Sequence, residues 1–171
     1  CDADGRVYVT DTGGGMAPGW VHVFDGDGVF LQRWSMAGSE ELIYPEDAAV
    51  SPDGHLYVVE EGSRIHKFTL AGAHVLSFGS CCTGAPARLR SPMGIDVDEN
   101  GLVYVADAGN GRIAVFDGEG AYVRSWTGAA TQEGLLHQPM AVACDDRGTI
   151  FVVDLETTLQ TTRLNAYTPT G

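Results

Sequence analysis

Short apolar runs alternate with polar turns rich in glycine and aspartate along the whole chain. One arrangement, a turn followed by an apolar run and an acidic residue, occurs four times: DADGRVYVTDT (2–12), SPDGHLYVVEEG (51–62), DENGLVYVADAG (98–109) and DDRGTIFVVDLE (145–156). The later copies are evenly spaced, since Tyr57, Tyr104 and Phe151 are each 47 residues apart. A fixed period of this length indicates one supersecondary unit that is copied and stacked.

The third copy shows most clearly how the unit is built. Its apolar runs predict four short strands, at 93–97, 103–105, 112–116 and 122–126. The turns between them are rich in Gly, Asn and Asp, which is typical of an antiparallel meander. The runs are apolar on both faces, as in a sheet that is covered on both sides, and no window shows sustained helical periodicity. Four such strands in a unit of about 45 residues predict an all-β fold made of β-propeller blades.

Residues 91–120, SPMGIDVDENGLVYVADAGNGRIAVFDGEG, resemble an NHL repeat, whose pattern is P-x-G-I-x-V-x-x-x-G-x-[VI]-Y-V-A-D-x-x-N-x-R-I-x-V-F. The second copy departs from this pattern at Glu60 and Ser63, the first copy has a longer Gly-rich linker, and the fourth has a polar insertion. The resemblance covers essentially the whole chain. It implies a β-propeller of NHL type, in a family whose rings commonly have about six blades. Such repeats serve as interaction domains in many contexts, and some related propellers are lyases or hydrolases.

We therefore expect one partial propeller over residues 1–171. Its blades are predicted at 1–43, 44–90, 91–137 and 138–171. By the phase of the repeat, the first blade lacks its innermost strand and the last lacks its outermost strand. We expect an open arc of about four four-stranded antiparallel blades, forming part of a six-bladed ring that further chain or a partner completes.

The net charge of −13 comes from acidic residues that are spread along the chain. Such a field repels phosphate backbones, so we expect no nucleic-acid partner. No apolar stretch approaches the roughly 20 residues that span a bilayer, so we expect no membrane insertion. The four cysteines indicate no particular compartment. Cys81 and Cys82 are adjacent, and they are either two thiols in a loop or a strained disulfide.

An acidic residue at the end of the second strand and an arginine at or near the start of the third recur in three copies. The pairs are Glu60 with Arg64, Asp107 with Arg112, and Asp154 with Arg163. Each pair can join across the connecting turn by charge-assisted hydrogen bonds. Because catalysis needs a unique site, a repeated pair predicts a structural clasp rather than a catalytic group.

One turn also matches the opening of a calcium-binding loop. Asp96, Asp98 and Asn100 occupy its first ligand positions, and Asp107 occupies its twelfth. Strands rather than helices flank this turn, and Ser51 breaks the pattern in the second copy, so an ordinary hairpin is the simpler interpretation. The five histidines do not place three ligands on the propeller axis. We therefore expect no metal and no cofactor.

These patterns favour a non-catalytic scaffold for protein interaction within a larger protein or assembly. The partner is expected to be another protein or the remainder of the parent chain. Loops that differ most among the copies are predicted to bind it, at residues 12–20 and 156–162. The candidate contact residues are Met16, Trp20, Glu156, Thr158 and Gln160. The alternative is a metal-dependent lyase or hydrolase of propeller fold, with its site on the central axis.

Overall fold

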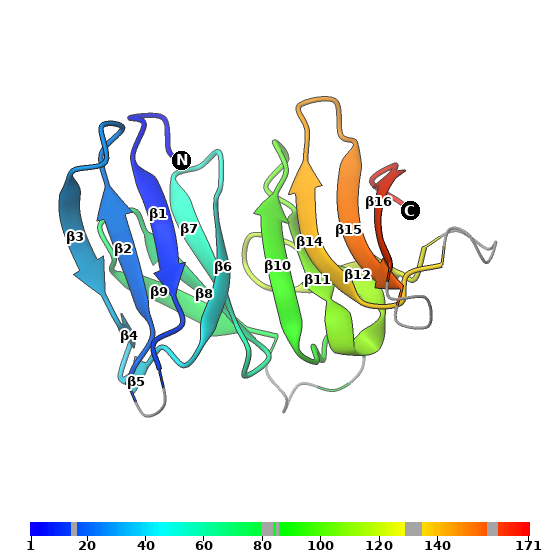
Figure 1. The fold of residues 1–171 in the computed structure, drawn as a ribbon, viewed down its shortest axis with the longest axis horizontal. Helices are drawn as coiled ribbons and strands as arrows, with labels where there is room; N and C mark the ends of the chain where they lie inside the picture. Colours follow the sequence, from blue (N-terminus) through cyan, green and yellow to red (C-terminus); the bar gives the residue numbers. More distant parts are fainter. Residues whose placement is uncertain (15–16, 80–83, 85, 129–134, 157–160) are drawn as a thin grey trace.

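A computed structural model describes residues 1–171 apart from 15–16, 80–83, 85, 129–134 and 157–160. The chain forms a row of antiparallel sheets that lie side by side in sequence order (Figure 1). Within each sheet, strands that are consecutive in sequence are neighbours in space. The fold is an all-β partial propeller whose ring is not closed, so the predicted fold class is confirmed.

Four sheets make up the arc, and we call them blades one to four. Blade one has β1 (Val7–Asp11), β2 (Trp20–Phe24) and β3 (Phe30–Trp34). Blade two has β6 (Pro45–Val50), β7 (His55–Glu60), β8 (Arg64–Thr69) and β9 (His74–Phe78). Blade three has β10 (Pro92–Val97), β11 (Val103–Asp107), β12 (Arg112–Phe116) and β13 (Tyr122–Trp126). Blade four has β14 (Pro139–Cys144), β15 (Ile150–Glu156) and β16 (Thr161–Tyr167).

The intervals predicted for the blades remain a proposal. Their borders, after residues 43, 90 and 137, fall between these sheets. Among the described residues, one single-turn 3-10 helix, η1 (Ala108–Asn110), follows β11. In the part of the chain that the structure describes, no helix is long and apolar enough to cross a membrane.

The first strands of blades two to four begin in the same way. Each starts with a proline that lies opposite an acidic residue at or near the end of the second strand, and the register shifts by one residue directly afterwards. Proline has no N–H to donate, so it is tolerated at the start of a strand or beside a bulge. The repeated bulge therefore gives each blade the same geometry at the point where the chain enters it.

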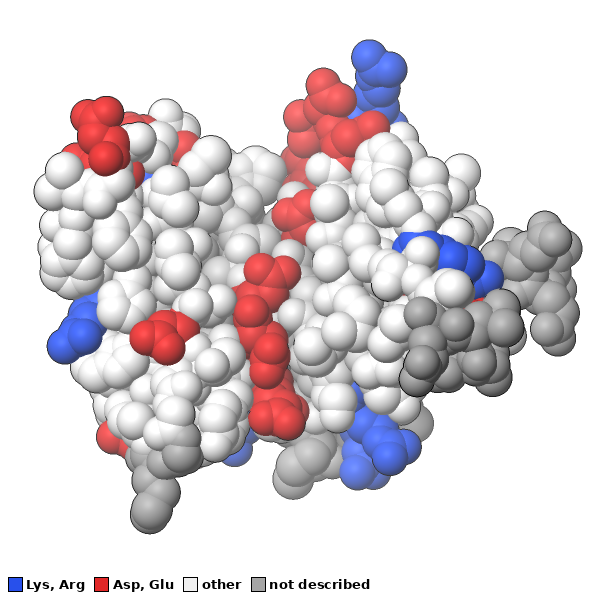
Figure 2. Space-filling view, viewed as in Figure 1, with Lys and Arg blue, Asp and Glu red and all other residues white. Residues whose placement is uncertain are grey.

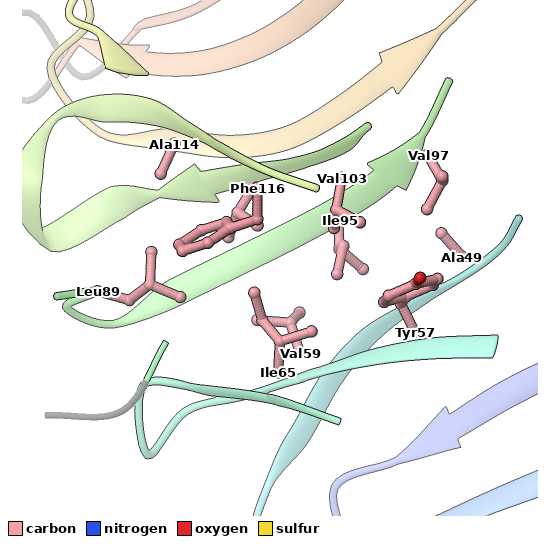
Figure 3. Close-up of a cluster of buried hydrophobic side chains, with 11 residues drawn as sticks. Ala49, Tyr57, Val59, Ile65, Leu89, Ile95, Val97, Val103, Ala114 and Phe116 are labelled. Atoms are coloured by element: carbon pink, nitrogen blue, oxygen red, sulfur yellow. The ribbon is translucent and has the colours of Figure 1, made fainter. Parts of the chain in front are cut away.

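The core lies between the blades. Figure 3 shows the cluster between blades two and three, where apolar side chains from the two sheets point toward one another. Its largest members are Tyr57, Ile65, Leu89 and Phe116. Similar clusters join blades one and two and blades three and four. Blades two and three are thus covered on both faces, which explains why their strands are apolar on both sides.

Blade one leads into blade two through a small hairpin that the sequence did not predict. It consists of β4 (Met36–Ala37) and β5 (Glu40–Glu41), each only two residues long. Strands this short carry no measurable periodicity. The turn between them uses Gly38 at a positive φ of 69°, a conformation that favours glycine.

Candidate functional site

The two ends of the sheets differ in structure and in charge. We call the lower end in Figure 1 the anchor rim; it carries the connections β1–β2, β7–β8, β11–β12 and β15–β16 and those between blades. We call the upper end the turn rim; it carries the remaining tight turns. Figure 2 shows mostly acidic side chains along the upper edge and basic side chains at the lower edge beneath blade three. Both loops predicted to bind a partner connect strands at the anchor rim.

An acidic residue at or near the end of the second strand is buried in blades two to four, and it holds the segment that leads into its own blade. Its carboxylate accepts a hydrogen bond from the backbone N–H two positions before the proline that starts the blade. The acceptors and donors are Glu60 with Ile43, Asp107 with Arg90, and Asp154 with His137. A buried N–H requires a partner, so this position has a structural reason to keep a carboxylate in every copy.

In blade three the clasp arginine extends this anchor. Arg112 donates from Nε to Oδ2 of Asp107 at 2.7 Å, and only 13% of its side chain is exposed. Its NH2 group donates to the carbonyl oxygens of Pro86 and Arg88, both at 2.8 Å. One guanidinium therefore joins β11 and β12 to the loop that enters the blade.

Blade four repeats the arrangement with one additional carboxylate. Arg163 donates to Asp154 at 2.9 Å and to the carbonyl of Leu135 at 2.8 Å. Oε2 of Glu156 lies 3.1 Å from Nδ1 of His137 and 3.6 Å from the Arg163 guanidinium. The structure thus places Glu156, a candidate contact residue, in a largely buried position within the clasp.

Blade two adds further partners to this position. Glu60 and Arg64 are directly opposite in the β7–β8 register, and Arg64 hydrogen-bonds to Glu40 on the β4–β5 hairpin. Oε2 of Glu60 lies 3.4 Å from Nε2 of the buried His66. The additional hairpin, which brings a second carboxylate to the anchor rim, explains why Arg64 reaches out of its own blade.

The other candidate contact residues are only partly placed. Trp20 starts β2 and is half-buried, with the guanidinium carbon of Arg33 4.2 Å from its ring centroid. Such a cation–π contact holds the ring against a side chain of the neighbouring strand β3. Met16, Thr158 and Gln160 lie outside the described residues.

Of the three calcium-loop residues, Asp98 and Asn100 lie in the turn itself, and Asp98 organises it. Oδ1 of Asp98 accepts the N–H groups of Asn100 and Leu102, both at 2.9 Å, and Oδ2 accepts the Tyr104 hydroxyl at 3.2 Å. Burial, together with the charge of Asp98, raises the pKa of Tyr104 to about 12. The Asp98 carboxylate is therefore the cap of a hairpin turn.

The third residue, Asp96, joins two blades. Its carboxylate accepts the N–H of Cys144, on β14, at 2.7 Å. Asp47 on β6 does the same for the N–H of Ile95, on β10, at 3.0 Å. Within the described part of the chain, no three His, Cys, Asp or Glu side chains are grouped to hold a metal ion. That no metal binds here stays a prediction, which a calcium titration would test.

A second set of contacts between blades was not predicted. At each blade interface a side chain donates to the backbone carbonyl at the same position of the next blade's third-to-fourth-strand turn, or its equivalent after β16. The donors and acceptors are Gln32 with Leu70, Lys67 with Gly118, and Arg124 with Pro169. Tyr57 also donates its hydroxyl to the Gly118 carbonyl, at 3.0 Å. The signal in the sequence is a long polar side chain inside an apolar strand, as at Lys67.

One cavity on the anchor rim is basic. It has a volume of about 630 Å³ and we call it the basic pocket. Its lining residues are Pro86, Arg88, Leu89, Arg90, Asn110 and Arg112. On the turn rim, by contrast, cavities are lined by acidic residues such as Glu99, Asp145 and Asp146. The sequence analysis did not single out Arg88 and Arg90, which stand at the end of the second predicted blade.

The repeated anchor, clasp and bulge describe one structural unit, and comparison with known proteins identifies it. The family model of the NHL repeat matches residues 89–116. The chain therefore contains an NHL repeat and resembles the NHL-repeat family. Human NHL repeat-containing protein 3 is 29% identical over 140 residues, which cover 75% of this chain and 40% of the relative. The mouse protein of the same name is 28% identical over 159 residues, covering 86% and 44%.

The chain spans less than half the length of these two relatives. Among solved structures, U3-55K matches with a TM-score of 0.66 at 13% identity, covering 94% of this chain and 48% of that one. Hydrazine synthase of Kuenenia stuttgartiensis matches with a TM-score of 0.63 at 19% identity, covering 87% of this chain and 40% of that one. Virginiamycin B lyase from Staphylococcus aureus matches with a TM-score of 0.60 at 15% identity, covering 98% of this chain and 57% of that one. At these identities the likeness shows the fold alone.

Proposed function

We propose that this chain is a non-catalytic interaction scaffold that binds a protein partner through its anchor rim. One observation supports this most: the polar residues that recur from blade to blade are engaged in holding the fold. The carboxylates of Asp107 and Asp154 bind backbone N–H groups and arginines, and Asp98 caps its own turn. The side chains that differ from blade to blade are instead concentrated in the loops of the anchor rim.

The anchor rim is well suited to present variable loops. Each loop that enters blades two to four is tied down by the same buried carboxylate, so the loop backbone is positioned whatever its other side chains are. A rigid scaffold with variable loops loses little conformational entropy on binding. Copies of one blade can therefore carry different contact residues without loss of the fold.

The lyase or hydrolase alternative requires a set of ligands on the axis. The carboxylates of Asp47 and Asp96, on the innermost strands, accept backbone N–H groups of the neighbouring blade. No specific observation in the described residues favours this alternative over the scaffold. Elemental analysis of purified protein tests it directly, because a stoichiometric metal would support the enzyme.

The proposal is tested by exchanging loops. Residues 12–20 and 156–162 would be replaced by the short β11–β12 turn, and partners captured by chemical crosslinking would be identified and then titrated as purified proteins. We expect the exchange to abolish binding while the folded β signal persists. A matched control carries Asp27→Asn and Glu119→Gln on the turn rim and should bind normally. Full binding by the loop exchange would contradict the proposal.

A further inference from the structure

We propose that the basic pocket binds an extended acidic segment of a protein partner, one with Asp or Glu at alternate positions. This inference rests on the proposed function and names the chemistry that one part of the anchor rim recognises. Four observations support it: the fixed backbone of the loop, its exposed arginines, its contrast with the equivalent loops, and the spacing of its two guanidinium groups.

The backbone of the loop is held before any ligand arrives. The carbonyl of Arg88 accepts hydrogen bonds from Arg112 at 2.8 Å and from the Asn110 amide at 3.2 Å. The N–H of Arg90 donates to Asp107 at 2.7 Å, and its carbonyl accepts the Gly109 N–H at 2.9 Å. The pocket wall is therefore preorganised, which lowers the cost of binding.

The side chains of this loop divide into one anchor and two exposed cations. Leu89 is buried in the cluster between blades two and three, whereas Arg88 and Arg90 are exposed. No carboxylate of the described residues forms an ion pair with either arginine. The nearby Asp107 carboxylate is fully buried and already holds Arg112 and Asn110. Two guanidinium groups are thus available to an incoming anion.

The equivalent loops show that the fold does not need these arginines. Leu42 and Leu136 are buried like Leu89 and occupy the same position in blades two and four. Their neighbours, at the positions equivalent to Arg88 and Arg90, are Glu41 and Ile43 in one loop and Leu135 and His137 in the other. If these two positions had a structural role, we would expect the same residue types in every copy, as for the leucine. The arginines are therefore explained better by a ligand.

The spacing indicates the form of the ligand. Burial alternates across Arg88, Leu89 and Arg90, as in extended chain, where side chains two residues apart lie on one side and about 6.6 Å apart. Carboxylates at alternate positions of an extended peptide have the same spacing and can bind guanidinium groups in bidentate fashion. The net charge of −13 repels any long polyanion beyond the pocket, so a short acidic segment is favoured over a long polyphosphate chain.

The test measures binding of a fluorescent peptide of alternating glutamate and serine by anisotropy, on the full chain. The test variant, Arg88→Leu with Arg90→His, carries the residues of blade four at these positions. We expect affinity for the peptide to fall at least about tenfold, with an unchanged thermal transition because both side chains are exposed. A control with Arg6→Gln and Arg147→Gln removes the same charge from the turn rim and should bind within about twofold of the wild type.

Three results would overturn the proposal. They are an absence of binding to the wild type, an equal loss in the test variant and the charge control, and equal binding of a peptide with glutamine in place of glutamate. A preference for oligonucleotide or phosphopeptide probes over the glutamate peptide would overturn it in favour of a phosphate site. If the test variant still captures the partner while the loop exchange of 12–20 and 156–162 does not, the scaffold proposal stands and this inference fails.

Discussion

At the scale of single residues, hydrogen bonds show what the motif residues of this chain do. Asp107 and Asp98 match ligand positions of a calcium loop in the sequence, yet Asp98 accepts backbone N–H groups of its own turn and Asp107 accepts one from the loop that enters its blade. A buried carboxylate that is fully hydrogen-bonded is a structural element. Removing it leaves several donors without a partner, which lowers the free energy of unfolding.

Substitution Asp107→Asn should destabilise the protein strongly. The amide cannot accept from Arg90, Asn110 and Arg112 together, because one of its two positions is itself a donor. We expect the free energy of unfolding to fall by about 2–4 kcal/mol, measured by urea denaturation. The control Asp27→Asn, in an exposed turn, should change it by less than about 0.5 kcal/mol. A similar small loss for both variants would show that Asp107 is not the anchor.

Substitution Tyr104→Phe should matter less at high pH than at neutral pH. The folded-state pKa of about 12 lies above the usual value near 10, so the unfolded chain ionises first and wild-type stability falls as pH rises from about 10 toward 12. The variant lacks this loss. At pH 7 the free energy of unfolding of the variant should be lower than that of the wild type, because the variant lacks the hydrogen bond to Asp98. Denaturation curves should show this difference narrowing as the pH rises from about 10 toward 12. A deficit that stays constant with pH would contradict the assignment.

At the scale of elements, neighbouring blades are joined by apolar clusters and by one repeated polar contact. Lys67 and Tyr57 both donate to the Gly118 carbonyl, and Lys67 Nζ also lies 5.5 Å from the Tyr57 ring centroid. The strands themselves were predictable, because β-rich runs between Gly and Asp turns have local causes. This contact was not, because it depends on which carbonyl the next blade brings to the end of Lys67.

The contact should show as coupling between two substitutions. Lys67→Met removes a charge-assisted hydrogen bond and should cost about 1.5–3 kcal/mol, and Tyr57→Phe about 0.5–1.5 kcal/mol. In each single variant the Gly118 carbonyl keeps one donor, so the double variant should lose more than the sum. A double-mutant cycle by urea denaturation measures this. Arg124→Met, at the next interface, is the control and should be additive with Lys67→Met; coupling in both cycles would contradict a local contact.

At the scale of the whole molecule, the arc is open and its charge is unevenly distributed. The phase of the repeat predicted an incomplete ring, and sheets of three strands stand at both ends of the row. Figure 2 shows a row of acidic side chains between blades two and three, where β6 and β10 are in contact. Composition gives the net charge but cannot place this row, because it depends on which strands become innermost.

The charge of Glu46, on β6, should lower stability at neutral pH. Burial and the charge of Glu61 raise the pKa of Glu46, so the charged form of Glu46 opposes folding above its unfolded pKa and the penalty disappears when the pH falls below that value. Glu46→Gln should therefore raise the free energy of unfolding at pH 7 by about 0.5 kcal/mol or less, with no gain near pH 3. Added salt should shrink the gain. A gain that persists in acid would point to packing instead.

The account rests on the anchor rim being the face that binds. Hydrogen–deuterium exchange of the full chain, with and without its captured partner, tests this most directly. We predict slower exchange on binding at residues 12–20, 86–90 and 156–162, and unchanged exchange in the turns of the turn rim. Slower exchange confined to the turn rim, or to the innermost strands β6, β10 and β14, would contradict it.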